Sequence, residues 1–194
     1  MDSLKENIAE RKAAYYNELA ERAKTEKEAF GELYDYFFPR VYNFIFGKVK
    51  NADQADDIIS HTFEKVFTRL DDYDSAKGAF STWIFRIALN EMNNLFRKQK
   101  RLNEAGWEEF FNPADERNTP EQQILSDEGD KHLLLALEKL NERERRIVSL
   151  KYFTGISNKE IAELEDMTAS NVGVVLHRTL DKLKKLLEGS GYML

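Results

Sequence analysis

The clearest pattern of hydrophobic and polar positions lies between residues 80 and 101, where apolar side chains recur every three to four residues. This spacing places them on one side of an α-helix and predicts a stripe that faces a protein core. The stripe consists of Phe80, Ile84, Ile87, Ala88 and Leu95. We therefore predict a helix over these residues, with its other side open to solvent or to a partner.

Further helices are predicted before this one. Residues 32–50 are strongly apolar around Pro39, where we expect a kink or a break because proline donates no backbone hydrogen bond. Residues 55–70 carry a helical stripe that includes Phe63. Residues 1–28 have only a thin apolar line, which predicts a polar helix that packs on the first domain, binds a partner or frays.

A second helical domain is predicted over residues 131–188. Asn141 is placed to cap a helix that Gly155 ends. Residues 157–160, S-N-K-E, have the pattern of a capping box at the start of a short helix.

A turn then leads from that short helix to a long helix over residues 170–187. We expect its inner face at Val172, Leu176, Leu180, Leu183 and Leu187. A short helix, a tight turn and a longer helix predict a helix-turn-helix, whose second helix lies in the DNA major groove.

Residues 103–130 separate the two domains and contain nine acidic residues, one base and no sustained periodicity. This composition predicts a flexible linker. The predicted fold class is therefore all-α, with two small helical domains joined by an acidic linker and a short tail over residues 189–194. The linker has a net charge of −8 and the whole chain −6, so the remainder is net positive.

The bulk composition excludes several function classes. The 194 residues include no cysteine, which excludes disulfides and thiolate metal sites. No signal peptide or membrane-spanning run is apparent, so we expect a cytoplasmic protein without membrane insertion. The three histidines lie far apart, and neither a nucleotide-binding glycine loop nor a nucleophile–base pair is visible. We therefore expect no cofactor, no metal ion and no enzymatic activity.

The side of the 80–101 helix opposite the apolar stripe is suited to nucleic acid. It carries one aromatic residue, three amides and four cations: Trp83, Arg86, Asn90, Asn93, Asn94, Arg97, Lys98 and Arg101. Aromatic and guanidinium planes stack on unpaired bases, amides bond base edges and cations bind phosphate. The alternative is a solvated helix whose basic last turn complements the helix dipole.

Three segments, taken in order, give the chain a family resemblance. Residues 55–63 read A-D-D-I-I-S-H-T-F, close to a family pattern A-E-D-L-V-Q-E-T-F. Asn90 ends I-A-L-N, like the family's I-A-x-N, and residues 176–178 read L-H-R as in its helix-turn-helix. In this respect the chain resembles bacterial RNA polymerase sigma factors of the small, two-domain extracytoplasmic-function type.

The resemblance implies a role for each segment. Residues 29–102 would be the domain that docks on core polymerase and melts and reads the minus-ten element, and residues 131–188 the domain that reads the minus-thirty-five element. Docking is implied for Asp56, Asp57, Ser60, His61 and Glu64. The minus-ten residues would be the outer face given above, with the loop at 71–79 and Asn90 capturing a flipped base. The minus-thirty-five residues would be Thr168, Ser170, Asn171, Val174, His177 and Arg178, while Gly173, Val174 and Val175 replace the family's usual Lys, Ser and Arg.

The implied partners are core RNA polymerase, promoter DNA and an anti-sigma factor. The linker has two interpretations: a nucleic-acid mimic in the polymerase channel, or a segment whose aromatics, Trp107, Phe110 and Phe111, pack on one of the domains. Two other functions stay open. One is a free-standing helix-turn-helix repressor or activator, and the other is a helical adaptor that does not bind DNA. A face suited to single strands and a net acidic chain both favour the sigma factor.

Overall fold

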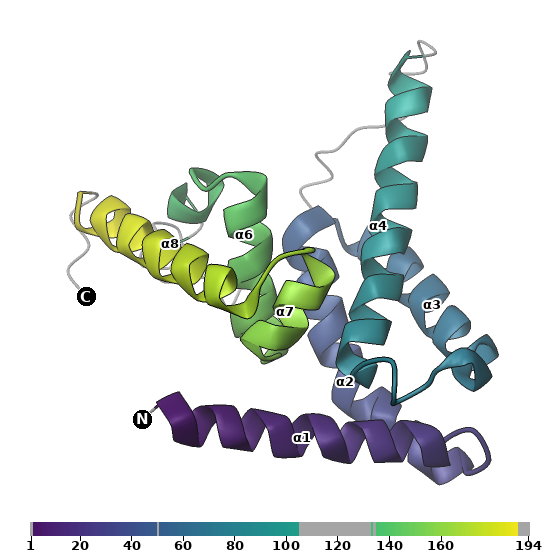
Figure 1. The fold of residues 1–194 in the computed structure, drawn as a ribbon. Helices are drawn as coiled ribbons and strands as arrows, with labels where there is room; N and C mark the ends of the chain where they lie inside the picture. Colours follow the sequence, from purple (N-terminus) through teal and green to yellow (C-terminus); the bar gives the residue numbers. More distant parts are fainter. Residues whose placement is uncertain (1, 50, 105–132, 134, 190–194) are drawn as a thin grey trace.

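The computed structural model describes residues 2–49, 51–104, 133 and 135–189, without the side chains of residues 2–10, 99–104 and 153. Its regular elements are helices throughout the described residues. The chain forms an upright group of helices beside a second, smaller group (Figure 1). The predicted linker began at residue 103, but residues 103 and 104 belong to the end of α4; its aromatics and residues 190–194 of the tail lie outside the described residues.

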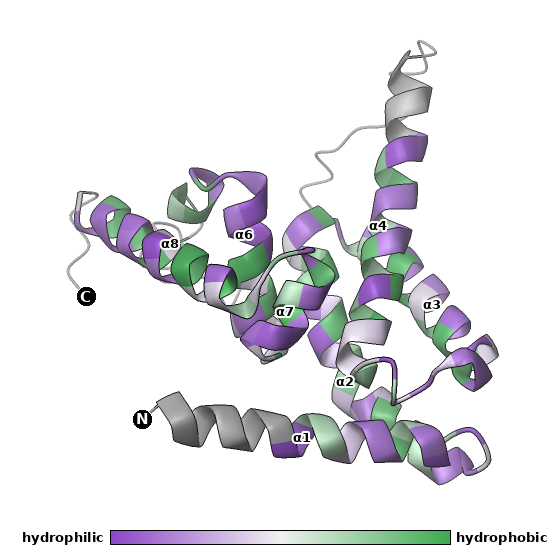
Figure 2. Ribbon diagram, viewed as in Figure 1, coloured by the Kyte–Doolittle hydropathy of each residue, from purple (hydrophilic) through white to green (hydrophobic). Residues whose placement is uncertain are grey.

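The first domain consists of four α-helices and one short 3₁₀-helix. These are α1 (Asp2–Arg22), α2 (Lys27–Val49), α3 (Ala52–Thr68), η1 (Leu70–Asp72) and α4 (Phe80–Glu104). Helices α2, α3 and α4 pack against one another, and α1 crosses their base (Figure 1). The hydrophobic positions of these helices gather where they meet (Figure 2). Phe44, Phe80 and Phe85 are fully buried at the centre of this core.

Helix α2 runs through Pro39, so of the two alternatives expected there, a kink or a break, the break does not occur. Proline leaves the carbonyl of Asp35 without its helical donor. Both residues are exposed, which lets water satisfy that carbonyl. Phe37 and Val41, on either side of the proline, are buried and hold the helix in place by tertiary packing.

Helix α1 is an integral part of the first domain. Leu19, Ala20 and Ala23 are buried in the core, and the Tyr16 ring stacks on Tyr36 with 3.9 Å between centroids. Tyr15, in contrast, is half exposed. Of the three alternatives expected for residues 1–28, the described part packs on the first domain.

The second domain contains α6 (Glu142–Ser149), the π-helical turn η3 (Leu150–Thr154), α7 (Asn158–Leu164) and α8 (Ala169–Gly189). Both predicted caps are confirmed: Asn141 and Ser157 each form a complete capping box with the glutamate three residues later. Gly155 follows η3 with a left-handed φ of 71°, as the predicted helix stop requires. Helices α7 and α8 form the predicted helix-turn-helix.

The inner face of α8 differs from the predicted stripe at one position. Leu180 is 39% exposed, whereas Thr179 is buried at 1%. The helical repeat of 3.6 residues makes both positions eligible for the inner face, and the packing of α8 on α6 and α7 selects Thr179. The other four predicted residues are buried.

The two domains pack against each other through a common hydrophobic core. Ile156 and Ile161 of the second domain belong to the same buried cluster as the core of the first domain. Helix α7 lies beside α4 and η3 beside α2 (Figure 1). At the centre of this seam, the buried Ser81 hydroxyl donates a hydrogen bond to the carboxylate of Glu160, which is only 7% exposed. The seam therefore contains a buried carboxylate, one oxygen of which has its hydrogen-bond donor only while the domains are closed.

Within the described residues, none of the helices combines the length and the hydrophobicity needed to cross a membrane.

Candidate nucleic-acid interface

The outer face of α4 is a continuous polar surface. Arg86, Asn90, Asn93, Asn94, Arg97 and Lys98 are all exposed, while the side chain of Arg101 lies outside the described residues. Arg97 lies along this surface, because its guanidinium donates to the Asn93 carbonyl (3.3 Å) and to Oδ1 of Asn94 (3.1 Å). These local bonds pre-order part of the face.

The one acid among these positions of α4 is turned away from the face. Glu91 forms an ion pair with Lys65 of α3 at 2.7 Å, and its side chain is only 12% exposed. Counted along the sequence, Glu91 is the one acid between residues 86 and 101 and would reduce their net positive charge. In the structure the carboxylate serves the α3–α4 contact, so the outer face presents cations and amides to a polyanion.

Trp83 does not stand free on the outer face, as the sequence pattern placed it. The indole is half buried and packs beside Phe80 and Tyr73, each with its ring centroid 5.6 Å away. It thus joins α4 to the loop that precedes it. An indole fixed in this way presents one defined surface for stacking.

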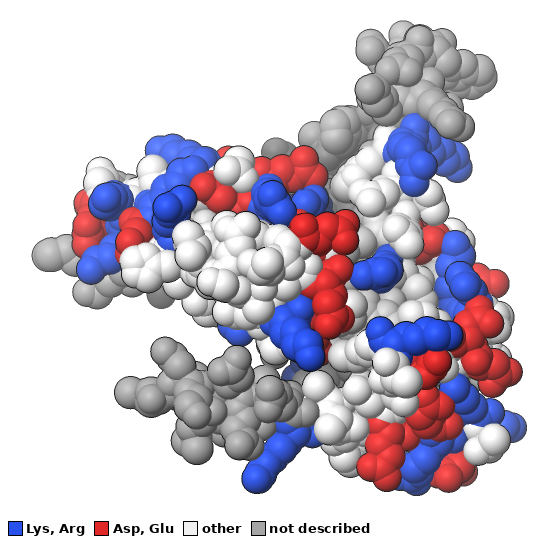
Figure 3. Space-filling view, in the orientation of Figure 1, with Lys and Arg blue, Asp and Glu red and all other residues white. Residues whose placement is uncertain are grey.

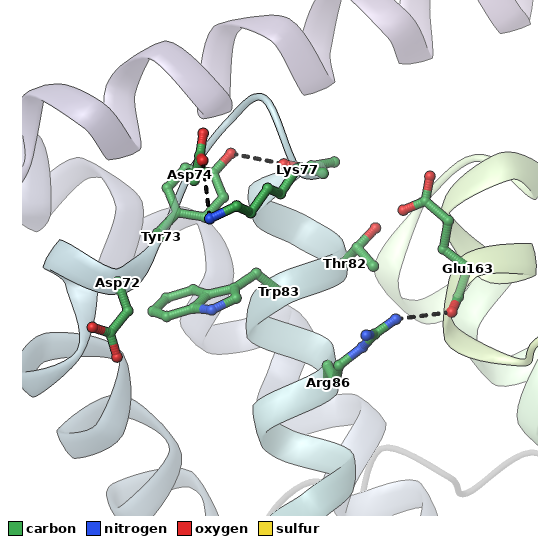
Figure 4. A pocket seen from close by; sticks show the side chains of 10 residues that line it. Asp72, Tyr73, Asp74, Lys77, Thr82, Trp83, Arg86 and Glu163 are labelled. Atoms are coloured by element: carbon green, nitrogen blue, oxygen red, sulfur yellow. Dashed lines mark hydrogen bonds and ion pairs between the residues drawn. The ribbon is translucent and has the colours of Figure 1, made fainter.

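A cavity of about 350 Å³ opens where that loop meets α4 (Figure 4). Its walls combine loop residues, the start of α4 and one residue of α7. The lining comprises Asp72, Tyr73, Asp74, Lys77, Gly78, Ala79, Thr82, Trp83, Arg86 and Glu163. Small-molecule sites occupy roughly 300–1,000 Å³, so the space lies at the lower end of that range.

Tyr73 forms the buried back of the loop. Burial raises the pKa of its phenol, which stays neutral and donates to the Gly78 carbonyl at 3.2 Å. Lys77 pairs with Asp74 at 3.2 Å across the loop (Figure 4). Together with the Asp74 Oδ1 bond to the Ala76 N–H at 3.0 Å, these contacts give the loop a defined shape.

The second domain covers part of this interface. Arg86 donates from Nη2 to the backbone carbonyl of Glu163 at 2.9 Å, and the Glu163 side chain lines the cavity (Figure 4). Acidic side chains lie along the seam where α7 meets α4 (Figure 3). A phosphate group approaching Arg86 would meet this negative charge, so the closed arrangement disfavours a nucleic acid here.

Two further predicted faces lie on other helices. On α3, Asp56, Asp57, Ser60, His61 and Glu64 are all exposed on the side opposite the buried stripe. At the start of α8, the predicted minus-thirty-five set, Thr168, Ser170, Asn171, Val174, His177 and Arg178, is also exposed. Thr168 Oγ1 accepts a bond from the Asn171 N–H at 3.2 Å and caps the helix. Each predicted set is therefore brought together on a single exposed helix face.

Sequence reasoning missed the participation of Glu163 in the cavity. This residue is separated by 77 positions from its partner Arg86, and no local pattern connects them. The individual roles of Tyr73 and Lys77 were also missed, although the loop that contains them was identified. In the part of the chain that the structure describes, no group of three or more His, Asp or Glu side chains could hold a metal ion.

Comparison with known proteins gives a consistent family. Residues 33–102 match the model for Sigma-70 region 2, and residues 131–183 match that for Sigma-70, region 4. The extracytoplasmic-function (ECF) RNA polymerase sigma factor BldN of Streptomyces coelicolor is 28% identical over 180 residues, which is 92% of this chain and 68% of BldN.

Two solved structures have the same fold. CnrH, in complex with the cytosolic domain of CnrY, aligns with a TM-score of 0.65 and 24% identity over 89% of this chain and 97% of CnrH. The sigma factor RpoE of Bartonella quintana, in complex with the anti-sigma factor NepR, aligns with a TM-score of 0.62 and 20% identity over 82% of this chain and 96% of RpoE. With both conserved sigma regions present in order, the chain belongs to the sigma-70 family, as a sigma factor of the extracytoplasmic-function type.

Proposed function

We propose that this sigma factor binds core RNA polymerase and directs promoter-specific initiation by capturing a minus-ten base in the cavity at the 72–79 loop. The observation that carries the proposal is the continuity of two surfaces. The cavity, with Trp83 and Arg86 in its wall, opens onto the exposed amides and cations of α4. A single strand lying along α4 would reach the cavity without a change of direction.

The energetics of base capture fit this site. Extruding a base from a duplex costs a few kcal/mol, and stacking one base on an aromatic side chain recovers about 1–3 kcal/mol. Trp83 supplies the ring and Asn90, on the exposed face of α4, an amide for base edges. Arg97 and Lys98 follow on the same helix and bind the strand through its phosphates.

The second domain reads the minus-thirty-five element in this proposal. The exposed start of α8 enters the major groove, where Asn171 and Arg178 supply hydrogen bonds to bases or phosphates. Val174 is 44% exposed and offers apolar contact to a thymine methyl group. The exposed acidic face of α3 docks on the polymerase.

DNA binding in this scheme requires the seam to open. In the closed arrangement Arg86 is engaged by α7, and the Glu163 carboxylate lines the cavity. Both are released when α7 leaves α4. An anti-sigma factor that holds the two domains together would keep the interface covered.

The chemistry of transcription belongs to the polymerase, so the chain acts as a specificity subunit and not as an enzyme. The proposal places it in the cytoplasm, where polymerase and DNA are. The two alternative functions, a free-standing repressor and an adaptor that does not bind DNA, are distinguished from a sigma factor by a transcription assay.

The first test is transcription by purified core polymerase on a library of random promoter fragments, with and without this chain. We expect starts preceded by a shared two-block motif. Retention of a palindromic fragment by the chain alone, without such starts, would favour the repressor. An absence of both starts and DNA binding would favour the adaptor.

The second test assigns the minus-ten site. Asn90→Ala should weaken open-complex formation by roughly tenfold, as for the loss of one base contact, while leaving core-polymerase affinity unchanged. Asn43→Ala is the matched control, because Asn43 is an exposed asparagine of α2 that does not line the cavity. Equal effects of both variants would contradict the assignment.

A further inference from the structure

Three polar side chains, two from α1 and one from the turn that follows it, bond to the backbone of the base-capture loop and of the first residue of α4. Asn17 Oδ1 accepts from the Phe80 N–H at 2.8 Å, and Glu21 Oε1 accepts from the Ser75 N–H at 3.0 Å. Lys24 Nζ donates to the Tyr73 carbonyl at 2.7 Å. Asn17 and Glu21 are four residues apart and lie on one face of α1, and Lys24 follows in the turn after the helix ends at Arg22. We call Asn17, Glu21 and Lys24 the α1 clamp.

The clamp is rigid because α1 is anchored in the core. Leu19 and Ala20, between the clamp residues, are buried, and Tyr16 is stacked on Tyr36. Glu21 and Lys24 also pair with each other at 2.6 Å. The loop itself is less well anchored, since Ser75, Ala76 and Lys77 are exposed. The position of the loop therefore depends on α1.

Asn17 has a specific task at the start of α4. The first N–H groups of a helix lack an internal acceptor, and the side chain at the preceding position, the N-cap, commonly accepts from the second or third of them. Here the N-cap is Ala79, whose side chain has no acceptor, and Asn17 of α1 accepts from the first of these groups, the Phe80 N–H. Phe80 is fully buried and its ring lies against Tyr73 and Trp83. The placement of the cavity wall thus depends on the Asn17 bond.

We propose that the α1 clamp positions the base-capture loop and thereby sets the selectivity of this sigma factor for the flipped minus-ten base. The inference rests on the proposed function of the cavity and assigns a role to the N-terminal segment. All three clamp bonds are to backbone atoms, so they fix the shape of the loop independently of its side chains. A preformed pocket discriminates between bases because it does not reshape itself around the wrong one.

The experiment uses the full-length chain in holoenzyme, on the promoter obtained from the library and on versions with the flipped base changed. Open-complex formation on each gives a discrimination ratio. Asn17→Ala should lower this ratio about five- to tenfold, in line with leaving one buried donor unpaired. Glu21→Ala should lower it in the same direction. Asn17→Asp keeps the acceptor and should keep the discrimination ratio of the unaltered chain. Glu18 is an exposed neighbour on α1, so Glu18→Ala should leave the ratio unchanged.

Core-polymerase affinity and thermal stability are measured on every variant, because a merely structural role would change them without changing discrimination. If Asn17→Ala and Glu21→Ala reduce initiation equally on all promoter versions, the clamp does not set selectivity. If Asn90→Ala and base changes also have no effect, the proposed base capture itself fails, which distinguishes the two outcomes. If Asn17→Ala does not fold, Glu21→Ala decides between the outcomes, because the Glu21 side chain is 37% exposed and its loss should not prevent folding.

Discussion

The closed arrangement of the two domains depends on a buried hydrogen bond that can be removed with little loss of volume. Ser81 donates to the Glu160 carboxylate at the centre of the seam. The other carboxylate oxygen accepts from the Ser157 N–H at 2.6 Å inside the second domain, so Glu160 keeps one partner after Ser81→Ala. A hydrogen bond to a charged group contributes about 1.5–3 kcal/mol. At 1.4 kcal/mol per factor of ten, the equilibrium should shift toward the open form by about 10- to 150-fold.

The chain is well suited to a direct measurement, because it has no cysteine and accepts two engineered ones as label sites. We expect the distance distribution between labels at Thr68 of α3 and Lys184 of α8 to lengthen and broaden in Ser81→Ala. Thr82→Val is the matched control: Thr82 is also buried, and its hydroxyl has no hydrogen-bond partner among the described residues. An unchanged distribution in Ser81→Ala, or the same change in both variants, would refute the reasoning.

Three further predictions use other parts of the molecule. Lys98→Gln should reduce the slope of log affinity against log salt for a minus-ten single strand by about 0.7; an unchanged slope in salt titrations would remove Lys98 from the phosphate-binding set. Gly155→Ala should lower the free energy of unfolding by about 1–2 kcal/mol in urea, because φ is 71° although the added methyl meets no atom; Gly155→Asn should cost less, and equal costs would argue against backbone strain. The bond from Lys24 lowers the pKa of Glu21. The stability that the ionised Glu21 carboxylate contributes is therefore fully present above the pKa that it has in the unfolded chain, and it is lost as the pH falls through the pKa of the folded chain. Hydrogen exchange at the Ser75 amide should therefore become less protected relative to neighbouring amides on acidification, and Glu21→Ala should abolish that pH dependence.

The local features of this protein follow from short stretches of sequence. The capping boxes at Asn141 and Ser157, the stop at Gly155 and the helix-turn-helix each depend on residues within a few positions of one another. The outer face of α4 is likewise a matter of helical periodicity. These features could be predicted because helical hydrogen bonding and side-chain spacing depend only on residues that are close in the sequence.

The tertiary structure decided what depends on residues distant in the chain. The choice of Thr179 over Leu180 for the inner face, and the continuity of α2 through Pro39, were set by packing that no single stretch specifies. The same holds for the Glu91–Lys65 pair, which leaves the α4 face without its acid. The bond from Asn17 to Phe80 spans 63 positions, and the cavity has walls from both domains. Such contacts arise only when separate helices share one buried core. The family was evident from local sequence motifs. The shape of the base-capture site and its covering by α7 came from the packing of helices far apart in the chain.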